Sequence, residues 1–258
     1  MSWASRRRVI YVLGGILVLA ALIAVPIVAY FAKPATCTDS IQNQGETAID
    51  KGGPCPLLDE RTLSPSSVLW SRSFRVRDGS YNTVAYIQNS NESAGISSAS
   101  YHLGLYDDRN ILVAERTGAT FIMPGSITPV FEPNINTGNR IVTHTYFEFT
   151  APLVWERMRN TAKVVNISNR EVSGVDAQPR IEAIAENTSV APIKEMSFIA
   201  VIFSPKGNAS AASATSLSRL SPGEKQQIVF TWPDKLDVAV GRVDILPRVL
   251  PVTAPAPQ

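Results

Sequence analysis

The chain has 258 residues, of which 18% are charged and 45% are hydrophobic, and its formal net charge at neutral pH is +2. Four basic side chains, Arg6, Arg7, Arg8 and Lys33, flank one apolar N-terminal segment, and the rest of the chain holds 20 basic and 22 acidic side chains. A nearly neutral remainder without a Lys/Arg cluster excludes recognition of a nucleic-acid backbone, which needs a basic surface.

The N-terminal segment predicts a membrane anchor. The 24 residues from Val9 to Ala32 are apolar or small. A helix of that length measures about 36 Å and can cross a bilayer core of about 30 Å. A cleaved signal peptide, the alternative, has an apolar core of about 7 to 15 residues and a small-residue cleavage site, where this chain has Tyr30 and Phe31. The preceding arginines favour a cytoplasmic N-terminus, so we expect a single-pass protein of the cell membrane with its later domains outside the cytoplasm.

The two cysteines, Cys37 and Cys55, follow this segment. A pair of exported cysteines usually forms a disulfide, which for a loop of this size is worth about 3 kcal/mol in the chain-entropy model. The loop between them is almost free of apolar residues, so the bridge is expected to order it. Oxygen-bearing side chains within the loop are of the type that bind calcium, and these candidate metal ligands are Asp39, Asn43, Glu46 and Asp50. Their spacing differs from that of an EF-hand, so we favour a solvated loop with Asx turns over a calcium site.

The same loop resembles a short cysteine-rich module of exported bacterial proteins, written C-x-D-G-x-x-N-x-x-E-x-x-x-D-C-G-G-x-C. The chain retains both outer cysteines, the four oxygen-bearing residues, Gly52 and Gly53. It departs from the module at Ser40, where glycine is usual, and at Lys51, where the module has another cysteine. The resemblance covers about 20 residues. It implies an extracytoplasmic spacer and no catalytic reaction. We expect no cofactor, and calcium is the one candidate ion for ordering the spacer.

Beyond a linker, short alternating runs predict antiparallel sheets with one buried face. Examples are the runs 68–76, 101–105, 141–149, 196–202 and 228–232. The chain also contains an internal repeat, in which Asn89 and Pro124-Gly125 recur 98 residues later as Asn187 and Pro222-Gly223. A unit of nearly this length has the size of a seven-stranded sandwich. We therefore expect an all-β fold with two tandem immunoglobulin-like antiparallel β-sandwiches.

The run Leu103-Gly104-Leu105-Tyr106-Asp107 resembles the signature of the FxLYD-type bacterial domain, a membrane-tethered immunoglobulin-like sandwich. Leu103 stands where that family has phenylalanine, and the second copy, residues 200–204, retains only the apolar and aromatic character. The resemblance covers residues 68–249. It concerns the fold, because the family has no general activity that could be transferred to this chain.

No residue pattern predicts catalysis, and we assign no catalytic or cofactor-binding residue. His102 and His144 lie out of phase with the apolar residues of their strands, and no nucleophile motif accompanies them. Trp70 and Trp232 are in phase with core residues, whereas Trp155 falls between the two units and is expected to pack one against the other.

The sequence thus predicts a non-catalytic membrane protein whose exported sandwiches bind or scaffold cell-envelope components. The partner would be an envelope protein or a cell-wall glycan, recognised through sandwich edges and end loops such as the hairpins 101–108 and 198–205. The alternatives are a structural spacer without a specific ligand and an envelope hydrolase with an unrecognised site. The expected divisions are 1–8 cytoplasmic, 9–32 transmembrane, 33–67 stapled loop and linker, 68–152 first sandwich, 153–249 second sandwich and 250–258 disordered tail.

Overall fold

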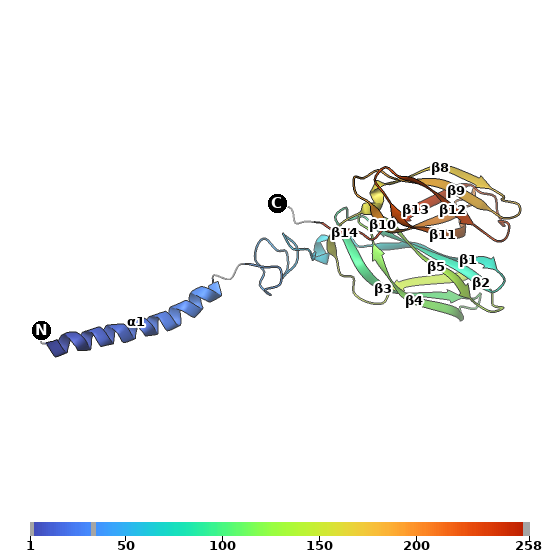
Figure 1. The fold of residues 1–258 in the computed structure, drawn as a ribbon. Coiled ribbons are helices and arrows are strands. Elements are labelled where there is room, and N and C mark those ends of the chain that lie inside the picture. The colour runs from blue at the N-terminus through green and yellow to red at the C-terminus, as the bar shows by residue number, and fades with distance from the viewer. Residues whose placement is uncertain (1–2, 32–34, 255–258) are drawn as a thin grey trace.

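The computed structural model describes residues 3–31 and 35–254, and it begins with one long helix, α1 (Trp3–Phe31), that leads toward a β-rich body (Figure 1). The stretch Arg6–Ala29 has a mean hydropathy of 2.8 and none of it is buried, so α1 is long and apolar enough to span a membrane. The helix begins earlier than the expected residue 9 and includes the three arginines. Lys33 and the expected end at Ala32 lie outside the described residues.

The rest of the described chain is all-β and forms two sandwiches of antiparallel strands. The first sandwich contains β1 (Ser67–Arg77), β2 (Ser80–Asn89), β3 (Ala94–Tyr106), β4 (Leu112–Ile122), β5 (Ser126–Asn136), β6 (His144–Phe149) and β7 (Glu156–Arg159). The second contains β8 (Val165–Ser173), β9 (Arg180–Asn187), β10 (Ile193–Phe203), β11 (Ala209–Leu220), β12 (Lys225–Thr231) and β13 (Arg242–Arg248), and the short strand β14 (Val252–Thr253) follows. Two 3-10 helices, η1 (Glu60–Thr62) and η2 (Thr161–Val164), precede β1 and β8.

The sheet orders show the internal repeat directly. In the first sandwich β1-β2-β5 faces a sheet of β3 with β4, β6 and β7, and in the second β8-β9-β12 faces β11-β10-β13. Strands 1 to 6 thus correspond to strands 8 to 13 in both order and pairing. The repeated asparagines have the same role in each unit. Asn89 donates to the carbonyls of Ala94 and Met123, and Asn187 donates to those of Ala191 and Leu220, so each fixes the turn between two sheets.

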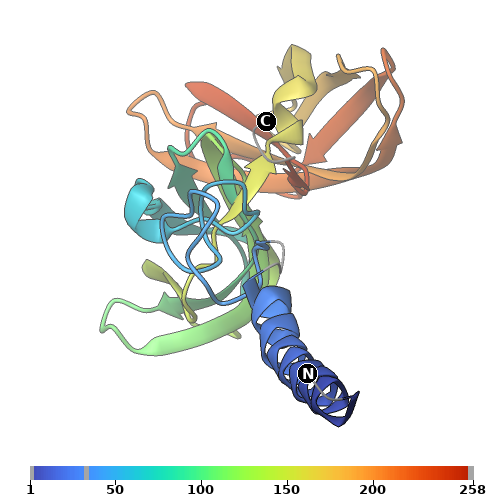
Figure 2. The ribbon, with the colours of Figure 1, turned by 90° about the vertical axis from the view of Figure 1, so that its left-hand side faces the viewer.

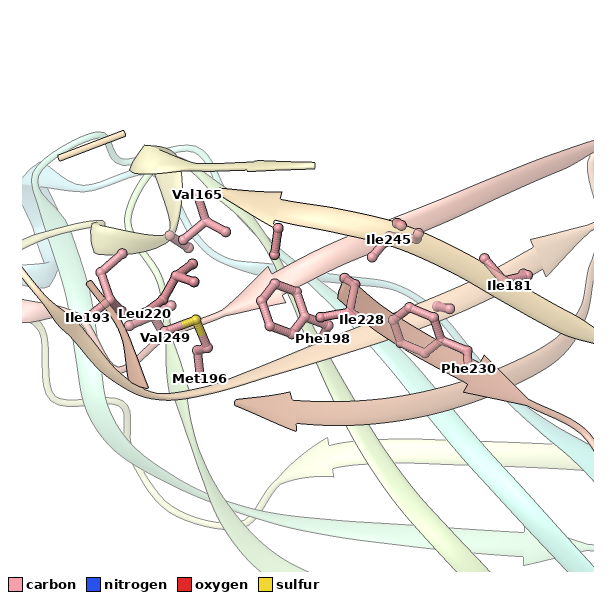
Figure 3. Packing of buried hydrophobic residues seen from close by; sticks show 14 of the residues in the cluster. Val165, Ile181, Ile193, Met196, Phe198, Leu220, Ile228, Phe230, Ile245 and Val249 are labelled. Atoms are coloured by element: carbon pink, nitrogen blue, oxygen red, sulfur yellow. The ribbon is translucent and has the colours of Figure 1, made fainter. Parts of the chain in front are cut away.

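The two sandwiches have separate cores made by the inward residues of their strands. Figure 3 shows the second core, in which Phe198, Ile228 and Phe230 lie between the two sheets. Alternation is clearest in β9, whose inward residues Ile181, Ala183 and Ala185 are buried while the residues between them are partly exposed. The period-two pattern therefore produced one buried face, as expected for an antiparallel sheet.

A third apolar cluster joins the two sandwiches. The outer face of β1-β2-β5 packs on the outer face of β11-β10-β13, so four sheets lie in one stack. Both central strands are buried on both faces. In β2 the outward Val84 and Tyr86 are 0% and 3% exposed, and in β10 the outward Val201 is 0% exposed. The members of this cluster are Phe74, Val84, Tyr86, Ile199, Val201, Phe203 and Ala212, with Trp70, Ile127, Phe131, Ala209 and Leu246 at its margin.

Aromatic contacts and hydrogen bonds complete the junction between the sandwiches. Trp70 lies 4.2 Å from the ring of Tyr86 and 6.2 Å from that of Phe203, centroid to centroid. Across the junction, Arg72 Nη1 donates to the carbonyl of Ala209 at 2.7 Å, and Asn82 Nδ2 donates to that of Ala212 at 3.1 Å. Trp70 is therefore the tryptophan at the junction. Trp155, expected there, is instead 6% exposed within the core of the first sandwich.

Strand β7 pairs with two chain segments, one from just before the first sandwich and one from just after the second. Beside it, the N–H of Arg157 donates to the carbonyl of Pro56, and the N–H of Ala254 donates to the carbonyl of Arg157. Residues 56–58 and 252–254 thus lie end to end along one edge of β7. Because β7 pairs with β3, the chain leaves the first sandwich after Arg159, later than the expected boundary at 152/153.

The expected disordered tail, 250–258, is wrong for its first part. Val252 and Thr253 pair with Arg159 and Met158, which returns the chain from the second sandwich to the first. Backbone pairing with an open strand edge provides the order that the Pro/Ala-rich sequence alone does not predict. Residues 255–258 lie outside the described part of the chain.

The junction generates a prediction for Phe203, which is 5% exposed. Replacing Phe203 by Ala should lower the free energy of unfolding by about 3 to 5 kcal/mol, because it removes a buried aromatic ring that packs between the two sandwiches. The native chain should unfold in one cooperative transition and the variant in two, as followed by calorimetry. Tyr146→Ala, at a site that is 53% exposed, is the matched control and should change stability little. Two transitions in the native chain would contradict a common folding unit.

Candidate functional site

The polar loop after α1 is closed by the Cys37–Cys55 disulfide, which brings the two Cα atoms to 5.5 Å although 18 positions separate them in sequence. Beyond the bridge the chain joins the first sandwich at once, because Leu58 donates its N–H to the carbonyl of Trp155 at 2.8 Å. Arg157 holds the loop from the other side by donating to the carbonyl of Gly53 at 2.8 Å. We call residues 37–58 the stapled neck.

The carboxylates expected to bind calcium are occupied by backbone groups of the stapled neck. Asp39 Oδ1 accepts the N–H of Ile41 at 2.9 Å, which is an Asx turn, and Asp50 accepts the N–H of Ser40 at 3.2 Å. The backbone N–H of Thr36 and the side-chain amide of Asn43 also donate to Asp39. These hydrogen bonds lower the pKa of Asp39, and the one from the Asn43 side chain has the largest effect on that pKa.

Glu46 lies beneath the disulfide and is 6% exposed. Its Oε2 accepts the N–H groups of Asn43 and Asp50 at 3.3 and 3.1 Å. Its Oε1 lies 3.1 Å from Cys55 Sγ, but a disulfide sulfur has no proton to donate, so this approach is a contact and the bridged sulfurs are not metal ligands. Within the described residues, the carboxylates of Asp39, Glu46 and Asp50 do not converge within 4.8 Å of one another. Calcium binding stays a prediction.

Among the four candidate calcium ligands, Asn43 has a side-chain oxygen that accepts no hydrogen bond from the described residues. Its amide donates to Asp39 at 2.9 Å, which fixes the orientation of the side chain, and its Oδ1 is buried without a donor among the described residues. The network of backbone N–H groups accounts for the order of the loop without an ion. The geometry therefore agrees with the Asx-turn interpretation.

Neither histidine is combined with a serine nucleophile among the described residues. His102 lies on the outer face of the first sandwich, with Nε2 3.0 Å from Glu115 and Nδ1 3.4 Å from Glu148. His144 Nδ1 lies 2.9 Å from the hydroxyl of Thr143. Activation of a hydroxyl nucleophile requires a base within hydrogen-bond reach and a third group that orients the base. The ring of His102 is already flanked by a carboxylate at each nitrogen.

The end of the sandwiches away from α1 is formed by loops. Strands β3 and β10 run from the neck side, where β3 pairs with β7, to this far end, where each enters a tight turn (Figure 1). The strands of the hairpins expected to recognise a partner, residues 101–106 and 198–203, are central and mostly buried. Only their turns, 107–111 and 204–208, are presented. The far-end loops are 78–79, 107–111, 137–143, 174–179, 204–208 and 232–241.

Three exposed aliphatic side chains lie at this end, on the loops 107–111 and 137–143 and at the start of β4, and we call them the far-end patch. Ile111, Leu112 and Ile141 are 52%, 40% and 71% exposed. Arg140 joins the two loops, because its Nη1 donates to the carbonyl of Leu112 at 3.0 Å and its Nη2 to Asp107 at 2.8 Å. Ile141 was expected to point inward from a strand, but β6 begins only at His144.

Asp107 fixes the shape of the loop that carries Ile111. Its Oδ1 accepts the N–H groups of Arg109 and Ile111 at 3.0 and 2.9 Å, and Asn110 adopts a left-handed φ of 58°. The hydrogen bond from Arg140 is the largest cause that lowers the pKa of Asp107, followed by that from Ile111. The far-end patch is thus held by an ionised carboxylate.

No family model matches the chain, and no curated protein matches it. Among solved structures, a crystal structure of red sea bream transglutaminase is similar at 10% identity, over 71% of this chain and 31% of that one, with a TM-score of 0.24. The chain therefore spans about a third of the length of that protein, and a likeness of this degree supports no argument about activity.

The Cys37–Cys55 disulfide is expected to protect the loop that it closes. Replacing both cysteines by serine should make residues 38–54 sensitive to protease, since loop closure of this size contributes about 3 kcal/mol and the loop has almost no core. Limited proteolysis followed by mass spectrometry of the fragments measures the change. The sandwiches should remain resistant in the same digest. A double variant as resistant as the native chain would show that the hydrogen bonds alone order the neck.

Asp107 generates a prediction about pH. Because the folded pKa is lowered, its contribution to the order of the loop is present above the ordinary carboxyl pKa of about 3.9 and is lost as pH falls through the lower folded value. Amide hydrogen exchange at Arg109 and Ile111 should therefore accelerate, relative to core amides, only at strongly acidic pH. In Asp107→Asn, which retains an acceptor without a carboxyl proton, this acid-dependent step should be absent.

Proposed function

We propose that the chain is a non-catalytic, single-pass membrane protein whose β-sandwiches bind or scaffold components of the cell envelope. The observation that carries the proposal is the far-end patch, a rigid group of exposed apolar side chains at the end of the body opposite the membrane helix. Exposed residues on loops held by a rigid scaffold are the usual location of recognition sites. The patch is small, so we propose that it contacts a protein partner as one anchor of a larger interface.

The anchorage is supported by three features together. Helix α1 is apolar and unburied over the length of a bilayer core, Arg6, Arg7 and Arg8 lie in its first turns ahead of the apolar stretch, and the chain beyond it holds a disulfide. Disulfides persist in oxidising compartments, which fits an extracytoplasmic position for the sandwiches and a cytoplasmic N-terminus. The resemblance to membrane-tethered FxLYD-type bacterial domains points in the same direction.

The rigidity of the body favours a scaffold over a flexible tether. Domains in one chain usually move relative to one another unless their interface is large and hydrophobic. Here Val84, Tyr86 and Val201 are almost fully buried at the junction, and β14 returns to the first sandwich. Such a body would hold the far-end patch at a fixed height above the membrane.

A photo-crosslinking experiment tests this proposal on intact cells. A benzophenone amino acid at Ile141 should capture one reproducible envelope protein, and the capture should be lost when Ile111 is also changed to Asp. Val172, on the edge strand β8 and 40% exposed, is the matched control position and should not capture that protein. Capture of only bulk wall material, or equal capture from both positions, would favour the structural spacer.

A further inference from the structure

A groove of about 620 Å³ lies at the neck end of the second sandwich, opposite the far-end patch. It is formed where β7 ends, by η2, by the loop that enters β10 and by the segment between β13 and β14. Figure 2, seen from the side of α1, shows that this end of the second sandwich and the end of the described chain face the same side as the helix. Among the residues that line it are Arg159, Val190, Lys194, Leu250 and Val252.

The rim of the groove exposes aliphatic side chains on ordered backbone. Val190 is 97% exposed, Leu250 is 55% exposed and Val252 is 42% exposed. The loop that carries Val190 is fixed by the fully buried Asn187, whose Nδ2 donates to the carbonyl of Ala191 at 2.8 Å. A valine held in water on a rigid loop has an unfavourable hydration free energy that no partner within the described residues relieves.

The first sandwich has a different residue at the equivalent position. The equivalent turn, residues 90–93, has only polar residues, and its Glu92 forms an ion pair with Lys163. The same turn is therefore polar and paired in one unit and apolar and unpaired in the other. The exposed valine of this turn therefore does not follow from the fold of the repeat.

The charge of the groove is positive. Arg159 and Lys194 line it, and the described residues that line it include no acidic side chain. Neither cation forms an ion pair with a residue of the described part of the chain. Arg159 is in register with Val252 on β14, so a cation and an exposed aliphatic residue stand side by side at the edge of the sheet. Exposed aliphatic residues next to unpaired cations are the combination that binds an anionic lipid surface.

The stapled neck keeps this end close to the membrane. Six Cα–Cα steps separate Phe31, the last residue of α1, from Cys37, and fully extended they span about 20 Å. The disulfide then adds only its 5.5 Å Cα–Cα distance, and Pro56 is already hydrogen-bonded to β7. The long polar loop therefore adds almost no reach. Strand β7 ends at Arg159, within the groove.

We propose that this groove contacts the surface of the bilayer that holds α1. Val190 and Leu250 enter the headgroup region, and Arg159 and Lys194 bind the phosphates of anionic lipids. Each cation near an anionic surface contributes about 1 kcal/mol, so the pair favours the anionic surface by about 30-fold. The contact rests on the membrane anchorage proposed above. It would fix the tilt of the rigid body and direct the far-end patch away from the membrane.

A spin-label experiment on the full-length chain in lipid nanodiscs tests the contact. Both native cysteines are bridged, so a single cysteine introduced at Val190 takes the nitroxide. Collisions with a water-soluble paramagnetic relaxer should be several-fold fewer at Val190 than at Ile141, the matched exposed position at the far end. The protection should be strong with phosphatidylglycerol in the disc and weaker with phosphatidylcholine alone. The double charge reversal Arg159→Glu with Lys194→Glu should remove this lipid dependence.

A third label, at Leu19 in α1, separates the two proposals. If Leu19 is protected while Val190 is as accessible as Ile141 in every lipid mixture, the groove does not contact the bilayer and the anchorage stands. If Leu19 is accessible, the anchorage and the contact both fail. Protection of Val190 that depends on the number of chains in each disc would assign the groove to a second copy and overturn the lipid contact. The comparison of lipid mixtures is made on a chain that retains Arg159 and Lys194. It therefore tests the lipid contact even if the charge-reversal variant does not fold.

Discussion

The burial of two central strands on both faces is the constraint on which the rest of this structure depends. Strands β2 and β10 each supply one face to the core of their own sandwich and the other to the junction between the sandwiches. Apolar area removed from water stabilises by about 25 cal/mol per Å², so a strand buried on both sides contributes to two interfaces at once. Neither sandwich can expose its junction face to water without uncovering Val84, Tyr86 or Val201.

The fixed junction explains why the ends of the chain can meet at β7. The stapled neck and the last strand lie along the same edge of that strand, one before and one after Arg157. They can do so only if the second sandwich is held against the first, because β14 leaves the second and pairs with the first. The neck, β7 and the groove thus form one continuous region nearest to α1, and the loops of both units form the opposite end.

Much of the fold was predictable from sequence because one-sided burial leaves a periodic signal. The alternation in residues 228–232 and the repeated asparagines predicted antiparallel strands and two equivalent units, as the structure has them. The junction was missed, although a signal existed. Residues 84–87 and 198–203 are nearly continuous apolar runs. Such runs are typical of strands that are buried on both faces. Alternation was expected in the second of these runs. Trp155 was expected at the junction because it falls between the two units in sequence, but Trp70 has that place.

The candidate site was less predictable because it depends on side chains that lie far apart in sequence. Arg140 joins the loop of Ile141 to that of Ile111, and nothing near Arg140 in the sequence indicates a partner at Asp107. The groove was equally unpredictable, because the exposure of Val190 becomes visible only in the folded chain. In the neck, the spacing of Asp39, Glu46 and Asp50 does not reveal that their oxygens accept backbone N–H groups, and calcium binding there stays a prediction.

The sandwiches are stacked head to tail, since the first presents its β1-β2-β5 face and the second its β11-β10-β13 face. An interface between unlike faces of equivalent units does not close on itself, and in principle copies could add without limit to form a fibre. The positions that match Ile199 and Val84 of the junction are His102 on one free face and Glu182 on the other. Polar outer faces are what end a repeat array. The stack is therefore terminated at two units by its own sequence, and a change of either residue to an aliphatic one would remove part of that protection against polymerisation.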